Sequence, residues 1–365
     1  MKKVLLSFMC DIIAAALVLT GIWFFNYQIT QPGVSAVSPQ INTGGSEIAQ
    51  TPAAAEDGSN DAMAAASFNN TANSTGELAQ TNVKLDSQDW HTKFADHFTD
   101  TVVSTDTSYT SPDLSIQLSS GSYDSHVCDT TSGGKHRKYG TNVSYVLADI
   151  YVGDITCIQT AFAKDTYGVG YSEKLSDMSD RIKAVLAVNG DSYNNNRHQD
   201  NGTIIRNGVI YRAQSTDMET CVLNWDGTMK IYQPEEMDTQ QLIQDGAYQS
   251  WIFGPSLLDE NGKAKTSFLT WDYIRQSHPR TAIGYYEPGH YCLLVVDGRQ
   301  KDSRGMFLDE MAGLFESLGC KAAYNLDGGH CSFMTMQGNV VSHPYKPEHE
   351  VPDGIFITEA TKWKS

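Results

Sequence analysis

Residues 291–329 read YCLLVVDGRQKDSRGMFLDEMAGLFESLGCKAAYNLDGG, and this stretch decides the fold. The apolar runs at 291–296 and 321–326 each predict a strand with little solvent exposure. A helical pattern separates the two runs, which is the order of elements in a β-α-β unit. The stretch therefore predicts strands that are connected through a helix, as in sheets with parallel strands.

The helix between these strands is marked by its apolar spacing. Apolar residues recur at intervals of three and four from Phe307 to Leu318. Ser303 or Asp302 is predicted to cap the first turn, and Gly319 is predicted to end the helix.

The rest of the folded region is rich in short strands and turns. Residues 144–151 and 155–162 are predicted to pair through a turn at Gly153-Asp154, and 182–188 predicts a buried strand. Hairpins are predicted where Asn-Gly, Asp-Gly or Gly-Asn pairs separate β-rich runs, at 203–212, 221–231, 256–264 and 334–341. With one further short helix at 239–244, the pattern predicts a mixed, sheet-rich α+β domain with few helices.

The chain begins with a membrane signal. Lys2 and Lys3 precede an apolar run at 4–27, which is long enough to cross a bilayer as a helix. We therefore assign 1–30 to a cytoplasmic stub and signal anchor. A cleaved signal peptide is the alternative interpretation, and both interpretations place the remainder outside the cytoplasm.

A linker is predicted at 31–84, before the folded domain. Its residues up to 80 include one aromatic side chain, Phe68, and no Lys or Arg, so they cannot bury enough apolar surface to offset chain entropy. Residues 85–143 are predicted to form a preface to a catalytic domain at 144–362.

The charge balance limits the classes of partner. The 365 residues include 43 acidic and 26 basic side chains, giving a formal net charge of −17. Such a chain lacks the surplus of Lys and Arg that nucleic-acid binding requires. A small anionic substrate needs only one or two well-placed arginines, so it is compatible with this composition.

Cysteine and carboxylate spacing does not call for a cofactor. The cysteines are widely spaced without a Cys-x-x-Cys pair, so we expect no zinc site and one disulfide at most. No ligand spacing requires a divalent cation. Asp191, Asp297 and Asp327 are the carboxylates that could bind one.

Polar side chains gather at the ends of four predicted strands. Each carboxylate could move a proton, each arginine could hold an anion, and the neighbouring glycines would let backbone approach a ligand. One such motif alone would more often be a turn, a surface ion pair or a structural histidine. Four together predict a site. They are Asn189-Gly190-Asp191, His278-Pro279-Arg280, Asp297-Gly298-Arg299 and Asn325-Leu326-Asp327-Gly328-Gly329-His330.

These motifs, with Phe253-Gly254-Pro255-Ser256-Leu257 among them, occur in the order of the phosphodiester glycosidase family, which the chain resembles over about 144–358. The resemblance implies hydrolysis of a sugar-1-phosphodiester at the anomeric carbon, on a phosphorylated glycan of the cell envelope or an exopolysaccharide. The catalytic candidates that follow are Asp327, Asp297, Asp191 and His330. The candidates for substrate binding are Arg280, Arg299, Asn189, Asn325, Gly328 and Gly329.

Two departures from the family pattern leave other functions open. His330-Cys331 stands where glycine and serine are usual, and Ser192 stands where an aromatic residue is more common. Ser192, His330 and Asp327 could instead form the triad of a GDS-type serine esterase. A non-catalytic domain that binds phosphoglycans at the cell surface is the third interpretation.

Overall fold

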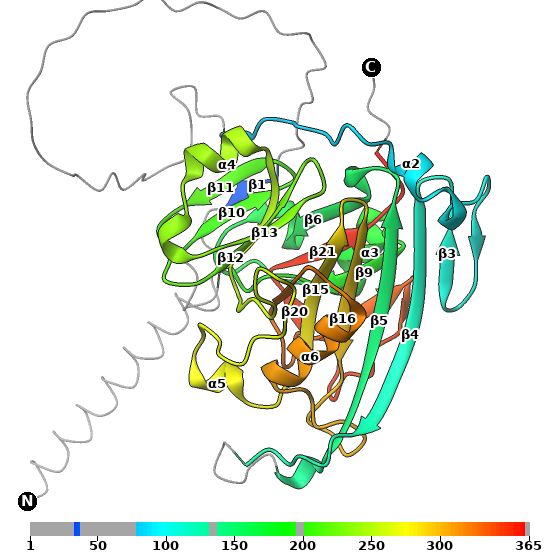
Figure 1. The fold of residues 1–365 in the computed structure, drawn as a ribbon, viewed down its shortest axis with the longest axis vertical. Coiled ribbons are helices and arrows are strands. Elements are labelled where there is room, and N and C mark those ends of the chain that lie inside the picture. Colours follow the sequence, from blue (N-terminus) through cyan, green and yellow to red (C-terminus); the bar gives the residue numbers. More distant parts are fainter. Residues whose placement is uncertain (1–32, 37–77, 131–136, 195–200, 362–365) are drawn as a thin grey trace, which may run out of the picture.

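The computed structural model describes residues 33–36, 78–130, 137–194 and 201–361. Its largest sheet has seven strands in the order β17-β15-β16-β5-β4-β3-β2. In Figure 1 the long β4–β5 ribbon flanks one side of the molecule, and a lobe with β10 to β13 and α4 lies on the other. The seven strands are β2 (Val103–Ser104), β3 (Ser108–Thr110), β4 (Leu114–Asp124), β5 (Asn142–Val152), β15 (Arg280–Glu287), β16 (His290–Val296) and β17 (Ala322–Asn325).

A second sheet of five strands has the order β19-β18-β9-β21-β6. It carries the Asn189 motif at the end of β9. Its strands are β6 (Ile158–Phe162), β9 (Leu186–Asn189), β18 (Met334–Met336), β19 (Asn339–Val340) and β21 (Asp353–Ile357).

The smaller sheets and the helices complete the described part of the chain. A three-stranded sheet contains β12 (Thr220–Asn224), β13 (Met229–Tyr232) and β14 (Ala247–Trp251). The strand pairs are β10 (Thr203–Arg206) with β11 (Val209–Ala213), β1 (Val34–Ser35) with β7 (Thr166–Tyr167), and β8 (Glu173–Lys174) with β20 (Glu350–Val351). The α-helices are α2 (Trp90–Lys93), α3 (Leu175–Ile182), α4 (Thr239–Asp245), α5 (Asp272–Arg275) and α6 (Leu308–Leu318).

Both faces of the seven-stranded sheet are buried at β16, which explains the continuous apolar run in this strand. Neighbouring side chains on a strand point to opposite faces. Leu293 and Val295 accordingly join the central core, together with residues of the five-stranded sheet. Leu294 and Val296 join a second core that α6 covers. The two sheets therefore pack on one another, and the helix closes the outer face.

The predicted β-α-β unit exists, but its two strands are not neighbours. β15 lies between β16 and β17 and is antiparallel to both. The connection through α6 thus skips one strand. The sequence did not indicate this, because the strand that intervenes comes before the unit in the chain.

α6 ends as predicted, whereas its predicted cap is wrong. Gly319 follows the last turn with a φ of +82°, the left-handed conformation that glycine adopts readily. The helix starts later than Ser303, and the Glu310 carboxylate accepts from the amide of Phe307 at 2.9 Å. Ser303 Oγ instead donates to the carbonyl of Asp297 at 2.6 Å, which ties down the loop before the helix.

Most predicted hairpins are confirmed, but one predicted pairing is wrong. The 203–212, 221–231 and 334–341 hairpins form, and 256–264 is joined by a single bridge. β5 pairs with β4 and β16, and β6 pairs with β21 in the other sheet. The residues between β5 and β6 therefore connect two sheets instead of forming a tight hairpin.

The predicted preface contributes strands to the largest sheet. β4 pairs with β5 over eleven residue pairs, and Leu114, Ile116 and Leu118 lie in the central core. The predicted anchor and most of the predicted linker lie outside the described residues. Among the residues that are described, no helix is long and apolar enough to cross a membrane. All six cysteines from Cys128 onward are free thiols.

Candidate functional site

A cleft of about 790 Å³ lies where the ends of several strands meet. Asp327, Arg280, Arg299 and His330 line it together with Gly328 and Gly329. Six of the ten site residues that the sequence predicted are therefore brought together. The other residues used below that line the cleft are Tyr171, Ser172, Ser192, Phe253, Tyr273, His278, Cys331, His349 and Glu350.

Asp327 is a partly buried carboxylate held by hydrogen-bond donors on both oxygens. Its Oδ2 accepts from Ser192 Oγ and its Oδ1 accepts from the amide of Gly328, both at 2.8 Å. Burial raises the pKa of Asp327, while hydrogen bonds from Cys331, Ser192 and Gly328 oppose that rise. A carboxylate balanced in this way is suited to proton transfer.

Arg299 lies in the cleft without a carboxylate partner among the described residues. Its guanidinium donates to Tyr345 Oη at 2.7 Å and to Tyr273 Oη at 3.2 Å. His278 Nε2 lies 2.9 Å from the carbonyl of Tyr273, so Nε2 carries the proton and Nδ1 accepts from Arg299 at 3.1 Å. Three neutral acceptors therefore orient the guanidinium and leave its charge uncompensated.

The backbone at Arg299 and Gly329 brings this guanidinium to the Asp327 loop. Arg299 has a φ of +59°, a left-handed conformation that is uncommon for a residue with a side chain. Gly329 has a φ of +69°, and a Cβ there would lie 3.0 Å from Arg299 Nη2. Glycine is therefore needed for this close approach.

Arg280 is almost fully buried and also lacks a carboxylate within ion-pair distance in the described part of the chain. Its Nε donates to the carbonyl of Met306, and Nη2 donates to those of Ile274 and Gln276. Burial, with the nearby charge of Arg299, lowers the pKa of Arg280 to about 9. A bound anion would relieve this cost, so Arg280 and Arg299 are suited to binding an anion.

Asn189 and Asn325 lie outside the cleft lining and hold its loops. Asn189 Nδ2 donates to the carbonyl of Asp327 at 2.8 Å, and its Oδ1 accepts from Thr281 Oγ1 at 2.7 Å. Asn325 Nδ2 donates to the carbonyl of Gly254 at 2.7 Å. Both amides are fully buried, so the structure places them behind the site instead of against a substrate.

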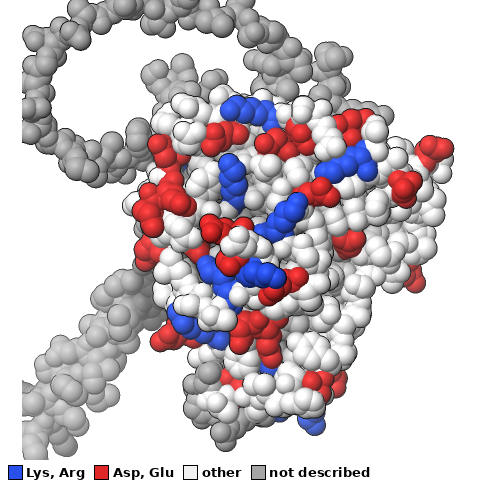
Figure 2. Space-filling model, viewed as in Figure 1, with Lys and Arg blue, Asp and Glu red and all other residues white. Residues whose placement is uncertain are grey.

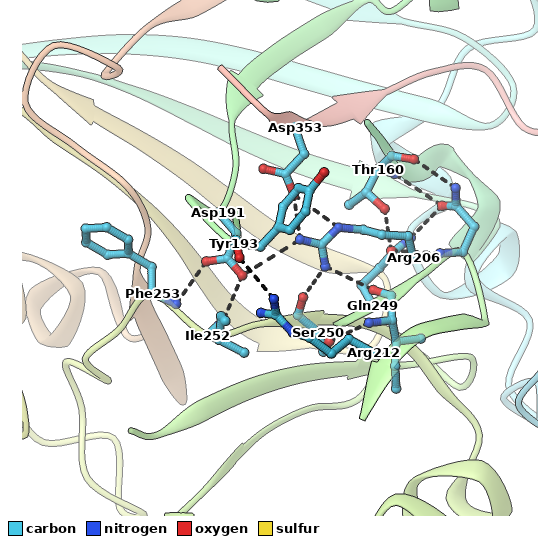
Figure 3. Close-up of polar contacts among 12 residues, drawn as sticks. Thr160, Asp191, Tyr193, Arg206, Arg212, Gln249, Ser250, Ile252, Phe253 and Asp353 are labelled. Carbon is cyan, nitrogen blue, oxygen red and sulfur yellow. Dashed lines mark hydrogen bonds and ion pairs between the residues drawn. The ribbon is translucent and has the colours of Figure 1, made fainter. Parts of the chain in front are cut away.

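Asp191, which the sequence predicted as a catalytic residue, is buried and does not line the cleft. Its carboxylate accepts from the amides of Ile252 and Phe253 at 2.7 and 2.9 Å and lies 3.7 Å from Arg206 (Figure 3). Asp353 accepts from the same guanidinium, with Nε at 3.1 Å. Burial raises the pKa of both carboxyls, that of Asp353 to about 7.

Asp297 is buried and does not line the cleft. Its Oδ1 accepts from the amide of His343 at 2.7 Å, and its Oδ2 lies 3.1 Å from both His343 Nδ1 and Ser144 Oγ. This carboxylate fixes the loop after β19. Its backbone nevertheless leads directly to Arg299, which explains why the motif seemed to be one unit in the sequence.

His330 lines the cleft but does not form a serine triad. Its Nε2 donates to the carbonyl of Pro347 at 3.2 Å, and its ring stacks on His349. Ser192 Oγ donates directly to Asp327. The contact between serine and histidine on which a triad depends is therefore replaced by a contact between serine and carboxylate.

The sequence missed Tyr273, Tyr345, His349 and Glu350. Tyr345 and the last two belong to a proline-rich segment, HPYKPEHEVPDG at 343–354, whose density of aromatic and titratable residues was a usable signal. Tyr273 lies in the short helix α5 and carried no comparable signal.

Charges are mixed on the face shown in Figure 2, where acidic and basic side chains alternate without a continuous basic patch. In the described part of the chain, no group of three or more His, Cys, Asp or Glu side chains could hold a metal ion. The concentrated feature is the cleft itself. The cleft is lined by a carboxylate held by hydrogen bonds and by two guanidinium groups that have no carboxylate partner among the described residues. This combination suits a hydrolase for anionic substrates.

Comparisons with known proteins agree with this class. Residues 183–358 match the family model for phosphodiester glycosidase, a family of hydrolases. The catalytic domain of zebrafish N-acetylglucosamine-1-phosphodiester alpha-N-acetylglucosaminidase has a similar fold. The TM-score is 0.50 at 21% identity, covering 68% of this chain and 88% of that one.

A curated relative is the SPbeta prophage-derived uncharacterized protein YomE of Bacillus subtilis (strain 168). It is 34% identical over 193 residues, which cover 52% of this chain. The chain spans 29% of the length of this relative.

Proposed function

We propose that the protein hydrolyses a sugar-1-phosphodiester, related to N-acetylglucosamine-1-phosphodiester, at the anomeric carbon. The observation that carries this proposal is the cleft that Asp327 lines together with two arginines, which have no carboxylate partner among the described residues. The match of residues 183–358 to the phosphodiester glycosidase family model supports the same reaction.

The reaction needs one proton acceptor and one anion clamp. In the mechanism we propose, the Asp327 carboxylate takes a proton from a water molecule, whose oxygen then bonds to the anomeric carbon. The bond from that carbon to the phosphate oxygen breaks, and the phosphomonoester leaves with the electron pair. Arg280 and Arg299 stabilise the charge on that leaving group.

The leaving group explains why one carboxylate in this position suffices. Most glycosidases pair two carboxyl groups, because one must protonate a sugar alkoxide as it leaves. A phosphate is already ionised near neutral pH and departs without taking a proton. We therefore replace the predicted catalytic roles of Asp191 and Asp297 with positioning roles, and we give Asn189 and Asn325 the same role.

No metal is required in this mechanism, because the two guanidinium groups supply the positive charge. We expect turnover to survive dialysis against EDTA. A fall in turnover that added Mg²⁺ or Ca²⁺ restores would contradict this part of the proposal.

The proposed place of action is the outer face of the cytoplasmic membrane. The apolar run at 4–27, next to Lys2 and Lys3, supports an anchor there, and cleavage of that segment would release a secreted form. Phosphorylated glycans of the cell envelope or exopolysaccharide are the substrates within reach. Recovery of the tagged chain in the cytosolic fraction would contradict this location.

The direct test measures free sugar released from an N-acetylglucosamine-1-phosphodiester. Asp327→Asn and Arg299→Ala are expected to lose at least 100-fold in kcat/KM, whereas Arg181→Ala, outside the cleft lining, keeps the wild-type rate. Binding without release of sugar would favour a phosphoglycan-binding domain. Release of acyl groups instead of sugar would favour an esterase.

A further inference from the structure

Two histidines, His330 and His349, line the cleft in addition to the two arginines. His330 follows Gly329, which lies against Arg299. The ring of His330 stacks on that of His349, with centroids 4.6 Å apart and planes 14° apart. Arg280, Arg299, His330 and His349 all line the cleft.

The segment that carries His349 is already fixed in place at the cleft. Arg299 Nη1 donates to Tyr345 Oη at 2.7 Å, and the ring of His330 lies 5.6 Å from that of Tyr345. His330 Nε2 donates to the carbonyl of Pro347. We call residues 345–350 the imidazole wall, and these contacts within the protein hold it at the cleft.

The acidic side chains of the imidazole wall are bound to hydroxyl groups. Glu348 accepts from the amide and the hydroxyl of Ser176 at 2.8 and 2.6 Å. Glu350 accepts from Ser172 Oγ at 2.6 Å. The remaining charged groups near the two imidazoles are Asp327, Arg299 and Lys346. Neither imidazole has a carboxylate as a hydrogen-bond partner among the described residues.

His349 has ring nitrogens that form no hydrogen bond with a described residue. Two stacked imidazoles repel each other when both are protonated. Burial and the neighbouring His349 accordingly hold the pKa of His330 below its usual value. An anion in contact with both rings would remove this repulsion, so anion binding and proton uptake by His330 are linked.

The two arginines already supply enough donors for one phosphodiester, which has two non-bridging oxygens. The imidazole pair lines the same cleft near Arg299 and supplies ring nitrogens in addition to those donors. We propose that His330 and His349 bind a second phosphate, carried by the alcohol that the reaction leaves on the phosphomonoester. This inference rests on the proposed function and names its substrate class, a sugar-1-phosphodiester within a chain of repeating phosphates.

The test compares two ligands by calorimetry on the full chain carrying Asp327→Asn, which prevents turnover. One ligand is the methyl phosphodiester of N-acetylglucosamine 1-phosphate. The other is the same diester with glycerol 3-phosphate in place of methanol. We expect the second ligand to bind about tenfold more tightly at pH 6, with a smaller preference at pH 7.5.

When His330→Gln or His349→Gln is combined with Asp327→Asn, the two ligands should bind with affinities within about twofold of each other. The strength of a charge-assisted hydrogen bond predicts this loss of preference for the second ligand. His126→Gln is the matched control, because that histidine is 85% exposed and does not line the cleft. It should keep the preference.

Equal affinities in the parent, or a preference that survives His349→Gln, would overturn this inference alone. Failure of both ligands to bind would overturn the proposed function as well.

Discussion

The hydroxyl of Ser192 gives the sharpest test of how the cleft sets the charge of Asp327. Its Oγ donates to Asp327 Oδ2 at 2.8 Å, one of three hydrogen bonds that hold the pKa of this carboxyl down against burial. Ser192→Ala removes that bond. A hydrogen bond to a charged group contributes about 1.5–3 kcal/mol, and water that enters the cleft replaces part of it. We take about 1.4 kcal/mol as the net loss, which is one pKa unit.

The expected result is a shift in the pH profile of kcat/KM. The ionised carboxylate forms at higher pH in the variant, so the acid limb should move up by about one unit. Turnover below the limb then falls about tenfold, and the plateau above it changes by less than about threefold. Ser172→Ala is the matched control, since its hydroxyl donates to Glu350. It should leave the limb in place.

Two results would refute this reasoning. An unmoved limb would mean that Asp327 is not the group whose titration the profile reports. A loss of about 1000-fold on the plateau would mean that Ser192 is itself the nucleophile, as in the esterase interpretation.

Three further predictions concern Arg299 and the buried residues Asn189 and Asp353. Arg299→Lys should raise KM at least tenfold, because an ammonium cannot keep the contacts to Tyr273, Tyr345 and His278; an unchanged KM would contradict a phosphate-binding role. Asn189→Ala should lower the free energy of unfolding by about 2 kcal/mol, because it leaves buried hydrogen-bond partners unpaired. Tm and kcat should both fall, and a stable variant with normal kcat would contradict the positioning role of Asn189. Between pH 4 and 7 the raised pKa of Asp353 should make the wild type lose up to about 1.4 kcal/mol of stability per unit rise in pH, because this carboxyl is ionised in the unfolded chain and stays protonated in the folded protein. Urea titrations at several pH values should show a smaller dependence of the free energy of unfolding on pH in Asp353→Asn. Equal pH dependence in both proteins would contradict this prediction.

Local sequence patterns predicted the individual helices and hairpins of this fold better than they predicted which strands lie side by side in the sheets. The spacing from Phe307 to Leu318 and the turn residues of three hairpins were sufficient, because contacts close in sequence determine them. The place of β15 between β16 and β17 depends on contacts far apart in the chain. The same holds for the separation of β5 from β6, so neither could be read from local spacing.

The candidate site shows the same limit at the level of single side chains. Asp191, Asp297 and Asp327 each follow an apolar strand and look alike in the sequence. Only the fold decides that Asp191 accepts from the amides of Ile252 and Phe253, some sixty residues away, while Asp327 faces the cleft. A pattern of this kind locates the region of a site and cannot assign each carboxylate within it.

The central claim concerns which bond breaks, and hydrolysis in water enriched in ¹⁸O tests it most directly. The full chain would be incubated with an N-acetylglucosamine-1-phosphodiester, and both products would be analysed by mass spectrometry. Attack at the anomeric carbon places the label in the released sugar and none in the phosphomonoester, and Asp327→Asn should abolish both products. Label in the phosphate would show cleavage between phosphorus and oxygen, and it would contradict the mechanism proposed for Asp327, Arg280 and Arg299.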